Sequence, residues 1–380
     1  MSPGVEFDKN TMLLTQTSQV DFKNLCRLDV LGLADSSEKD QDAVYDEFKE
    51  NISCQPATNN NREETMFAKQ QLGTNPESET KLLGLSWDKS QDTLSVTTNK
   101  AEPASTKRGA LSQLAKVYDP VGLVSPTTLP GKLLYREMCE ANLAWDREFP
   151  ETLTKQWKEW YEQFPERYTV PRTLAPNQQP ILSVSLHAFG DASKDGVTVA
   201  VYAVIEQENG TTQGVVCSKS HIAKRNLTIP QLELVSGHMA ANLVTNVETA
   251  IGNEKVTSVH CWLDATFTLY WMNSQGEYRQ FVSNRVKKIQ EHKRLEWHHV
   301  PTNKNPADLG SRGGNIVGNE LWAHSPEWLS DKKKWPPKVI LEVSFEANEE
   351  IKHAQSTQAL TTSSQPTDSD VSKSTLCERF

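Results

Sequence analysis

The stretch Ser183-Val-Ser-Leu-His-Ala-Phe-Gly-Asp191 decides the fold of this chain, because apolar and polar residues alternate along it and an acidic residue ends it. Alternation of this kind is typical of a β-strand. A second apolar run, Thr198 to Ile205, follows after a short polar segment and predicts the strand that pairs with the first. The carboxylate of Asp191 is therefore expected at the end of a strand in a sheet.

Two further acidic residues follow predicted strands. Asp264 comes directly after Val259-His-Cys-Trp-Leu263, a short apolar run typical of a buried strand. Asp308 follows another strand candidate, Leu295-Glu-Trp-His-His-Val300, and is predicted in the turn Asn303-Lys-Asn-Pro-Ala-Asp308. Strand ends are where the sheet of an α/β protein presents its ligands, so both carboxylates are candidate ligands.

Glu233 is predicted to lie near the start of a helix. Thr228 can cap this helix, and Pro230 suits its first turn. The apolar residues that follow recur at helical spacing: Leu232, Val235, Met239, Leu243 and Val247. A helix start, like a strand end, can present a carboxylate to a site at the edge of a sheet.

Each of these acidic residues also has an ordinary structural explanation. A single Asp after a strand is usually a turn or cap residue, and a Glu in a first helical turn is usually there for the helix dipole. Four carboxylates in suitable settings along one stretch favour a shared site instead.

Four segments in this stretch carry a resemblance to a known family. They are Phe189-Gly-Asp-Ala-Ser-Lys-Asp-Gly196, Leu227-Thr-Ile-Pro-Gln-Leu-Glu-Leu234, Cys261-Trp-Leu-Asp-Ala265 and Asn305-Pro-Ala-Asp-Leu-Gly-Ser-Arg312. In this order they resemble the ribonuclease H domain of BEL/Pao-type retrotransposon polyproteins. The resemblance implies an α/β fold with a ribonuclease H-like mixed five-stranded sheet and flanking helices. A smaller, mostly helical connection region and a poorly ordered N-terminus are expected to precede it.

The resemblance also implies a metal site and a reaction. Asp191, Glu233, Asp264 and Asp308 correspond to the four carboxylates that hold two Mg²⁺ or Mn²⁺ ions. Two divalent cations about 4 Å apart need several hard oxygen ligands, and they stabilise both the attacking water and the leaving oxygen of a phosphodiester. The expected function is hydrolysis of the RNA strand of an RNA·DNA hybrid, with that hybrid or another nucleic acid as the partner.

A different class of function stays open, namely an inactive relic of a retroelement that binds nucleic acid or protein. Many ribonuclease H enzymes have a mobile histidine shortly before the last aspartate, where this chain has Pro301-Thr-Asn-Lys-Asn305. His298 and His299 precede that segment in a predicted strand, where packing against the sheet is the ordinary role. This departure puts turnover in doubt more than metal binding.

Four side chains are candidate substrate contacts. The segment Val216 to Arg225 ends a predicted strand and supplies cations that can meet substrate phosphates, although a solvated loop explains them equally well. The candidates are Lys219, Lys224, Arg225 and, close to the last aspartate, Asn305.

The rest of the chain divides by composition and resemblance. The predicted parts are a polyprotein connector remnant (1–50), a linker or deletion junction (51–80), a region like the thumb and connection of reverse transcriptases (81–174), the ribonuclease H-like domain (175–314), a linker towards a missing integrase (315–344) and a disordered tail (345–380). Within 81–174 the sequence predicts a hairpin from Leu82 to Val96, then helices over 109–118, 127–144 and 151–164.

Three activities of such polyproteins are excluded. A reverse transcriptase needs two adjacent aspartates, and the chain has no Asp-Asp pair. The region 81–174 resembles the Pao retrotransposon peptidase family, yet an aspartic peptidase needs Asp-Thr/Ser-Gly, and the nearest triplet, Asp35-Ser-Ser37, lacks the glycine. No integrase is expected either.

Composition agrees with an intracellular protein, cytoplasmic or nuclear. The 380 residues are 37% hydrophobic, and no apolar run approaches the roughly 20 residues that a membrane span needs. The N-terminus lacks a signal peptide pattern. The net charge of -9 arises mostly in residues 1–80, with 7 Lys/Arg against 15 Asp/Glu, whereas residues 181–314 have 13 against 12 and can meet a phosphate backbone.

Overall fold

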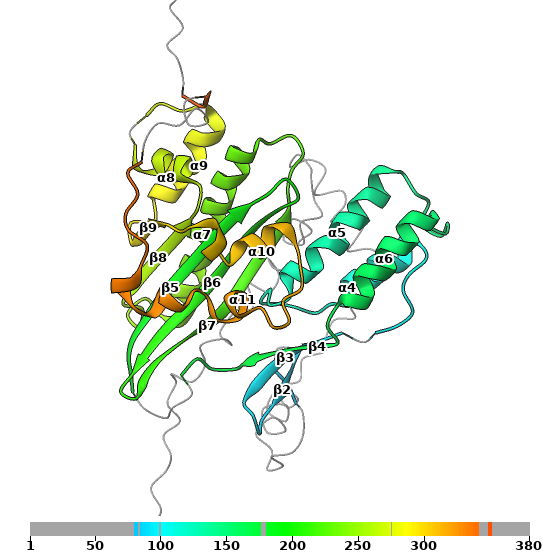
Figure 1. Cartoon of the computed structure of the whole chain (residues 1–380), viewed down its shortest axis with the longest axis horizontal. Coiled ribbons are helices and arrows are strands. Elements are labelled where there is room, and N and C mark those ends of the chain that lie inside the picture. Colours follow the sequence, from blue (N-terminus) through cyan, green and yellow to red (C-terminus); the bar gives the residue numbers. More distant parts are fainter. Residues whose placement is uncertain are drawn as a thin grey trace, which may run out of the picture.

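The computed structural model describes residues 80–82, 84–98, 100–175, 180–274, 276–341 and 349–351. The expectations for residues 1–79 and 352–380 lie outside these ranges. Figure 1 shows a central sheet with helices on it and, beside the sheet, a group of three helices with a small second sheet.

The central sheet has five strands of mixed direction. They are β5 (Ile181–Ala192), β6 (Gly196–Gln207), β7 (Gly210–Ile222), β8 (Ser258–Leu263) and β9 (Leu295–His299). The order across the sheet is β7-β6-β5-β8-β9, with β5, β6 and β7 antiparallel and with β5, β8 and β9 parallel. The predicted mixed five-stranded sheet is confirmed.

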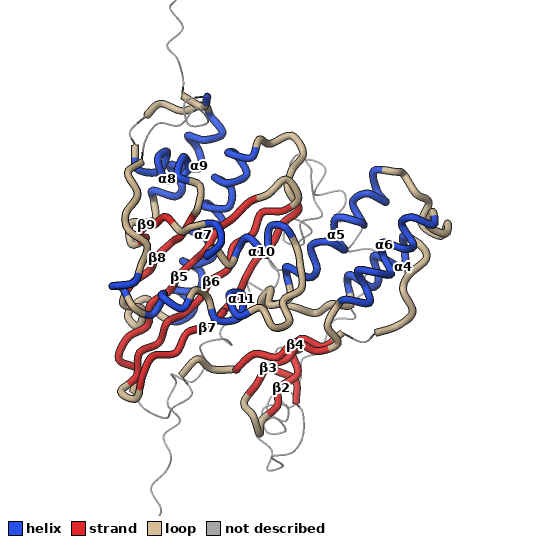
Figure 2. Tube along the Cα trace, in the orientation of Figure 1, coloured by secondary structure: helices blue, strands red, loops and turns tan. Residues whose placement is uncertain are grey.

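Helices cover both faces of this sheet (Figures 1 and 2). The helices α7 (Ile229–Ile251), α8 (Thr266–Asn273) and α9 (Gln280–Gln290) lie on one side. The short helices α10 (Ala307–Arg312) and α11 (Glu320–His324) lie on the other side. Alternate residues of β6 explain the two layers, because Val199 and Val201 pack in the same core cluster as α7, whereas Tyr202 packs in the cluster that contains Trp322 of α11.

Helix α7 begins where the sequence predicts. The side chain of Thr228 accepts a hydrogen bond from the backbone N–H of Gln231, and the Gln231 side chain accepts one from the Thr228 backbone N–H. This capping box satisfies two N–H groups that a helix start otherwise leaves unpaired. It also places Glu233 in the first turn or two of the helix.

The region before the central sheet contains more β-structure than predicted. The hairpin of β2 (Leu85–Asp88) and β3 (Thr93–Thr97) is confirmed, but β1 (Thr80–Leu82) and β4 (Arg167–Pro171) extend it to an antiparallel sheet of four strands. The prediction of a mostly helical region missed β4, although Tyr168 and Val170 alternate with polar residues and are buried in this strand.

The three predicted helices of this region are present. They are α4 (Lys107–Ala115), α5 (Ser125–Glu140) and α6 (Glu151–Gln163). The N-terminal end of α5 lies against β7, where the backbone N–H of Ser218 donates to Val121 O at 2.8 Å. Gly122, with φ +76°, comes so close to β7 that an added Cβ would lie 2.0 Å from Ser218 O.

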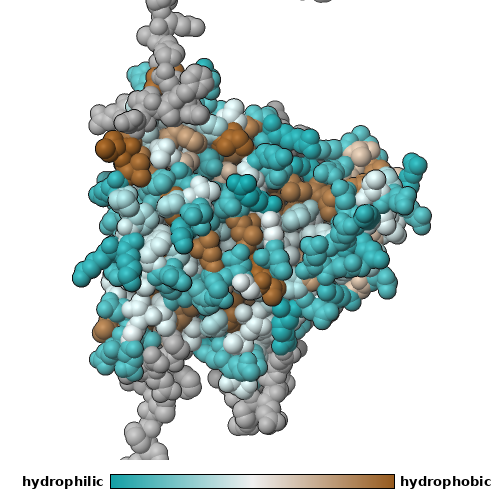
Figure 3. All heavy atoms as spheres, in the orientation of Figure 1, coloured by the Kyte–Doolittle hydropathy of each residue, from teal (hydrophilic) through white to brown (hydrophobic). Residues whose placement is uncertain are grey.

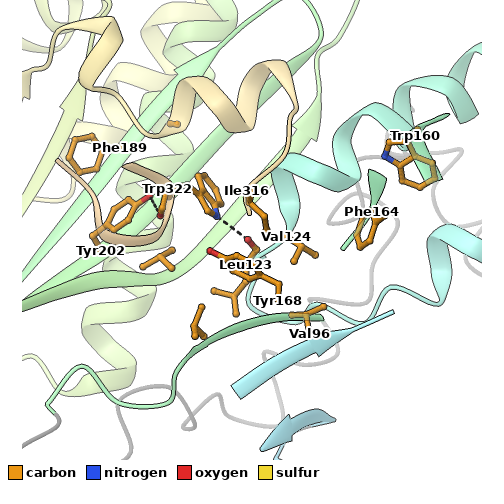
Figure 4. Packing of buried hydrophobic residues seen from close by; sticks show 14 of the residues in the cluster. Val96, Leu123, Val124, Trp160, Phe164, Tyr168, Phe189, Tyr202, Ile316 and Trp322 are labelled. Carbon is orange, nitrogen blue, oxygen red and sulfur yellow. Dashed lines mark hydrogen bonds between the residues drawn. The ribbon is translucent and has the colours of Figure 1, made fainter. Parts of the chain in front are cut away.

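One hydrophobic core joins this region to the central sheet. Figure 4 shows Trp160 and Phe164 of α6, Tyr202 of β6 and Trp322 of α11 within the same cluster. The indole Nε1 of Trp322 donates to Leu123 O at 3.0 Å. Residues on both sides of the predicted boundary between 174 and 175 therefore pack in one core.

Residues 315–341 are not the free linker that the sequence analysis predicts. Trp322 is fully buried, and the hydroxyl of Tyr202 donates to its carbonyl at 2.8 Å. The 3-10 helices η3 (Glu327–Ser330) and η4 (Lys332–Lys334) follow, and Leu329 is buried. The prediction of a linker rested on a resemblance to the segment before an integrase, and that resemblance did not reveal the large apolar side chains, such as Trp322, that complete the second face of the sheet.

The packing of Trp322 gives a stability prediction. Replacing Trp322 by alanine should lower the free energy of unfolding of the full chain by about 3–5 kcal/mol, because the change leaves a large cavity. Urea unfolding measures this. Val317→Ala, at a side chain that is 57% exposed, is the control and should change stability by less than about 0.5 kcal/mol. Equal effects of the two substitutions would show that the segment is a linker after all.

The surface agrees with a protein that packs its apolar residues inside. None of the helices in the described ranges has the length and apolar character to cross a membrane. On the face seen in Figure 3, hydrophobic residues form small patches among hydrophilic ones.

Candidate metal centre

Three of the predicted carboxylates meet at one end of the central sheet. Asp191, Glu233 and Asp264 each offer an oxygen, and these oxygens all lie within 4.8 Å of one another. The strand register explains part of this arrangement. Gly190 of β5 pairs with Leu263 of the parallel strand β8, so the next residues, Asp191 near the end of β5 and Asp264 directly after β8, lie side by side.

A close approach of α7 to the strands supplies Glu233. A Cβ added to Gly190 would lie 2.8 Å from Leu263 Cδ2 and 3.1 Å from Ser236 Oγ, and Ser236 belongs to α7. Any larger residue at position 190 would push the helix or Leu263 away. The absence of a side chain at position 190 thus lets the helix carry Glu233 close to the two aspartates.

Hydrogen bonds hold two of these carboxylates in place. The hydroxyl of Ser311 donates to Asp191 Oδ2, and the hydroxyl of Thr302 donates to Asp264 Oδ2 at 2.8 Å. Asp264 Oδ1 and Glu233 Oε2 are buried and have no hydrogen-bond partner within the described residues. A buried carboxylate oxygen without a partner is costly, and a bound cation would offset that cost.

Burial and mutual repulsion disfavour the ionised forms of the cluster. Burial raises the pKa of Glu233 to about 9, and the nearby Asp191 and Asp264 raise it as well. Burial also raises the pKa of Asp191 to about 7, with Asp264 and Asp308 adding to the shift. The pKa of Asp264 is raised by burial too, although the Thr302 hydrogen bond opposes this. Without a counter-charge, the three groups cannot all be ionised at neutral pH.

The donor set fits a hard divalent cation. Carboxylate oxygens are the ligands that Mg²⁺ and Mn²⁺ prefer, and a bound cation would stabilise the ionised carboxylates that burial disfavours. The two unpaired oxygens supply free lone pairs at the centre of the cluster. The residues therefore fit the metal ions that the sequence analysis expects.

Asp308, the fourth predicted ligand, lies near this group but is not one of the three. Its Oδ1 accepts a hydrogen bond from Nε of Arg312 at 2.7 Å. It is close enough to raise the pKa of both Asp191 and Asp264 by charge repulsion. The prediction of a turn at Asp308 was wrong, because Pro306 starts the helix α10 there and an acidic residue in a first turn is stabilised by the helix dipole.

The candidate substrate contacts differ in their surroundings. Lys219 lies half-buried on β7, and Lys224 is exposed just after that strand. Arg225 is exposed and forms an ion pair with Glu140 of α5. These cations stay predicted contacts.

Asn305 has a different role from the predicted one. It is 1% exposed, its Nδ2 donates to Gly190 O at 3.0 Å, and its Oδ1 accepts from the Ala307 N–H at 3.1 Å. A side chain buried in this way cannot meet a substrate. It instead ties the start of α10 to the end of β5, which positions the residues around Asp191.

The sequence analysis missed two residues that orient the carboxylates. Ser311 lies three residues after Asp308, within the segment Asn305–Arg312 on which the resemblance rests. The sequence therefore offered Ser311 as a candidate residue of the site. Thr302 lies in the 3-10 helix η2 (Thr302–Lys304), and nothing in the sequence pairs it with Asp264. His299, at the end of β9, is near enough to lower the pKa of Asp264.

The fold and the site together define a ribonuclease H-like α/β domain. Its strands run β7-β6-β5-β8-β9, and its carboxylates follow the parallel pair β5 and β8. Residues 106–265 match the family described as Pao retrotransposon-like RNaseH-like domain, so the Pao-type resemblance is confirmed over this range. The match runs from α4 to the end of β8, across the predicted boundary at 174 and 175, and covers less than half of the chain.

Solved structures of ribonucleases H are among the similar proteins. The N-terminal RNase H domain of a Mycobacterium tuberculosis protein, fused to maltose-binding protein, has 14% sequence identity and a TM-score of 0.25, with 34% of this chain and 93% of that chain covered. LC11-RNase H1 in complex with an RNA/DNA hybrid has 17% identity and a TM-score of 0.24, with 32% and 88% covered.

A larger viral enzyme shares more of this chain. The foamy viral protease-reverse transcriptase in complex with dsDNA has 10% identity and a TM-score of 0.21, with 58% of this chain and 44% of that chain covered. The search of curated proteins gave no match. At these low scores, the fold assignment rests on the strand order and strand directions given above.

Proposed function

We propose that this protein is a metal-dependent endonuclease of the ribonuclease H type, which hydrolyses the RNA strand of RNA·DNA hybrids. The observation that carries the proposal is the buried group of Asp191, Glu233 and Asp264, in which two oxygens have no partner within the described residues. Three carboxylates at such short separations repel one another and lose hydration, and packing alone does not offset this cost. A bound cation does offset it.

The side chains have separate roles in this proposal. Asp191 and Asp264 hold the cations, Glu233 completes one site, and Asp308 closes the other. Two bound divalent cations would supply an activated water and would stabilise the leaving oxygen of the phosphodiester. Ser311 and Thr302 keep the two aspartates oriented through their hydroxyl groups. Arg312 donates a hydrogen bond to Oδ1 of Asp308, and a carboxylate held in this way can still bind a cation through its other oxygen.

Cations on the edge strand β7 and just after it support a nucleic acid as the substrate. Lys219, Lys224 and Arg225 follow one another on β7 and just after it, and residues 181–314 have 13 Lys/Arg against 12 Asp/Glu. Bound metal ions would offset the negative charge of the clustered carboxylates. The rest of residues 181–314 then has a net positive charge. A phosphate backbone is attracted to such a surface.

The direct test is cleavage of an end-labelled RNA·DNA hybrid by the full chain in the presence of Mg²⁺ or Mn²⁺. We expect the RNA strand to be cut and the DNA strand to stay intact, and we expect chelation of the metal to stop cleavage. Duplex DNA and duplex RNA of the same sequence serve as the matched controls. Cleavage of either control at the same rate would contradict the specificity for hybrids.

A negative result has a defined meaning as well. If the folded chain binds the hybrid but does not cut it with either metal, the proposal is wrong. The alternative of an inactive binding module then holds. The ion pair between Asp308 and Arg312 is the structural feature that favours this alternative.

A further inference from the structure

A second group of metal-binding side chains lies on β8 and β9. Nδ1 of His260 is 3.1 Å from Nε2 of His298 and 3.5 Å from Oε2 of Glu296. Nε2 of His298 is 4.0 Å from the same oxygen. The three atoms thus form a small triangle, and its two sides to the carboxylate are longer than good hydrogen bonds.

The strand register brings these residues together, away from the carboxylate centre. His260 pairs with Glu296, and Trp262 pairs with His298, so all four side chains point to the same face of the sheet. His260 precedes Asp264 by four residues, which is about 13 Å along a strand. The group is therefore separate from the site formed by Asp191, Glu233 and Asp264.

The size of the triangle matches a transition metal. A circle through three atoms at these separations has a radius of about 2.1 Å, and zinc binds imidazole nitrogen at about 2.0–2.1 Å and carboxylate oxygen at about 2.0–2.2 Å. An ion slightly out of the plane of the three atoms, as tetrahedral geometry requires, would lie about 2.1–2.2 Å from each of them. Two imidazoles and one carboxylate are also a ligand set typical of zinc.

We propose that His260, Glu296 and His298 bind a divalent transition metal, and that Zn²⁺ fits this site best. Three protein ligands leave a fourth position of a tetrahedral ion open. The side chain of Glu296 is 64% exposed, whereas the ring of Trp335 packs against both imidazoles. The ion would join the edge strand β9 to β8.

The protonation states suit metal binding. Burial lowers the pKa of His260 to about 3 and also lowers the pKa of His298, so both imidazoles are neutral at pH 7. Neutral imidazole is the form that binds metals. The contacts with Glu296 are for the same reason not ion pairs between charged groups, although their distances alone would allow that.

The neighbouring histidine is not a ligand. His187 of β5 stacks on His260 with ring centroids 5.0 Å apart. Its Nδ1 accepts a hydrogen bond from Nε1 of Trp262, and its Nε2 lies 3.0 Å from Ser185 Oγ. With both nitrogens occupied, His187 supports the ring of His260 and leaves three residues to hold the ion.

Two features oppose binding of the ion, and each has a small energetic cost. Lys332 lies over Trp335 and its charge acts on His260 and His298, but Lys332 is exposed and solvent screens it. Metal binding at Nδ1 requires the proton of His260 on Nε2, which meets no acceptor within the described residues. A metal–nitrogen bond exceeds the cost of one unpaired N–H.

The test is Zn²⁺ binding by the full chain that carries Asp264→Asn, a change that weakens the carboxylate centre as a competing site. Competition with a chromogenic chelator measures the affinity and the number of ions. We expect one Zn²⁺ per chain. We expect His298→Ala in the same background to weaken binding by at least about 100-fold, since outer partners of metal ligands alone contribute 10–100-fold.

A matched control comes from another histidine on the surface. His324 lies 3.6 Å from Glu320 on α11, and His324→Ala should leave the Zn²⁺ affinity unchanged. If His298→Ala disturbs the fold, Glu296→Gln at an exposed position decides instead, with an expected loss of at least tenfold. Absence of saturable Zn²⁺ binding, or equal affinities of the His298→Ala and His324→Ala proteins, would overturn the proposal.

Discussion

The substitution Asp264→Asn is expected to lower the rate of hybrid cleavage by at least about 10³-fold, which corresponds to about 4 kcal/mol of lost transition-state stabilisation. Asp264 has one buried oxygen without a partner in the described part of the chain, and that oxygen is the one available to a cation. Asparagine keeps the size of the side chain and a hydrogen bond from Thr302, but it brings no negative charge. The substitution therefore removes the metal ligand and leaves the fold.

The matched control for this prediction is Asp195→Asn. Asp195 lies four residues after Asp191, outside the group of three carboxylates. This variant should cleave at close to the parent rate, and both variants should bind the hybrid as the parent does. Cleavage by the Asp264→Asn protein at the parent rate would show that the carboxylate group is not the catalytic centre.

The second large effect is a dependence of stability on pH in the metal-free protein. The folded-state pKa of Glu233 is raised to about 9, above its value in the unfolded chain. Between these two values the folded protein holds one more proton than the unfolded protein, so stability falls as pH rises. One proton corresponds to about 1.4 kcal/mol per pH unit. The metal-free parent should therefore lose about this much stability per unit between about pH 7.5 and pH 8.5.

Asp191, whose pKa is raised to about 7, adds to the loss of stability mainly below this range. Burial lowers the pKa of His187, His238, His260 and His298, so their ionisation affects stability mainly below about pH 7.5, where the unfolded chain still binds protons at these groups. Asp119, whose pKa burial raises to about 6, is also ionised by pH 7. Above about pH 8.5, Cys217 begins to matter, because burial raises its pKa to about 12.

Thermal unfolding of three proteins in the presence of a chelator measures the effect. Glu233→Gln should remove the pH dependence that Glu233 causes, whereas Glu208→Gln at an exposed position should keep it. The difference in melting temperature should change by a few degrees per pH unit. Added Mg²⁺ competes with protons for the carboxylates, so it should stabilise the parent more at pH 8.5 than at pH 7. Identical pH profiles of all three proteins would contradict the raised pKa.

Much of the central fold can be predicted from the sequence. The alternation in Ser183–Asp191, the apolar run Val259–Leu263 and the cap at Thr228 each depend on neighbours in the chain, and the structure has the corresponding strands and helix. The candidate carboxylates Asp191 and Asp264 could be named for the same reason, since a residue at a strand end is recognised from the strand itself.

Local patterns failed where distant contacts decide the outcome. The segment after Arg312 was predicted as a linker from its resemblance to the segment that leads towards an integrase, yet Trp322 lies in the core with contacts to Tyr202 and Leu123. Asn305 was predicted to meet substrate because it lies near Asp308, yet its amide is used by Gly190 and Ala307. Tyr202 and Leu123, which contact Trp322, and Gly190, which binds Asn305, each lie more than a hundred residues away in the chain.

The sequence by itself determined the strands and helices of the central layer, and it determined which acidic residues end them, because such signals lie within a few residues of one another. The tertiary structure alone decided which side chains meet. It aligned Gly190 with Leu263, so that Asp191 and Asp264 lie together. It also aligned β8 with β9, so that His260, Glu296 and His298 form a triangle. Strand register follows from the packing of the whole sheet, and a shift of one residue would reverse the face of every side chain.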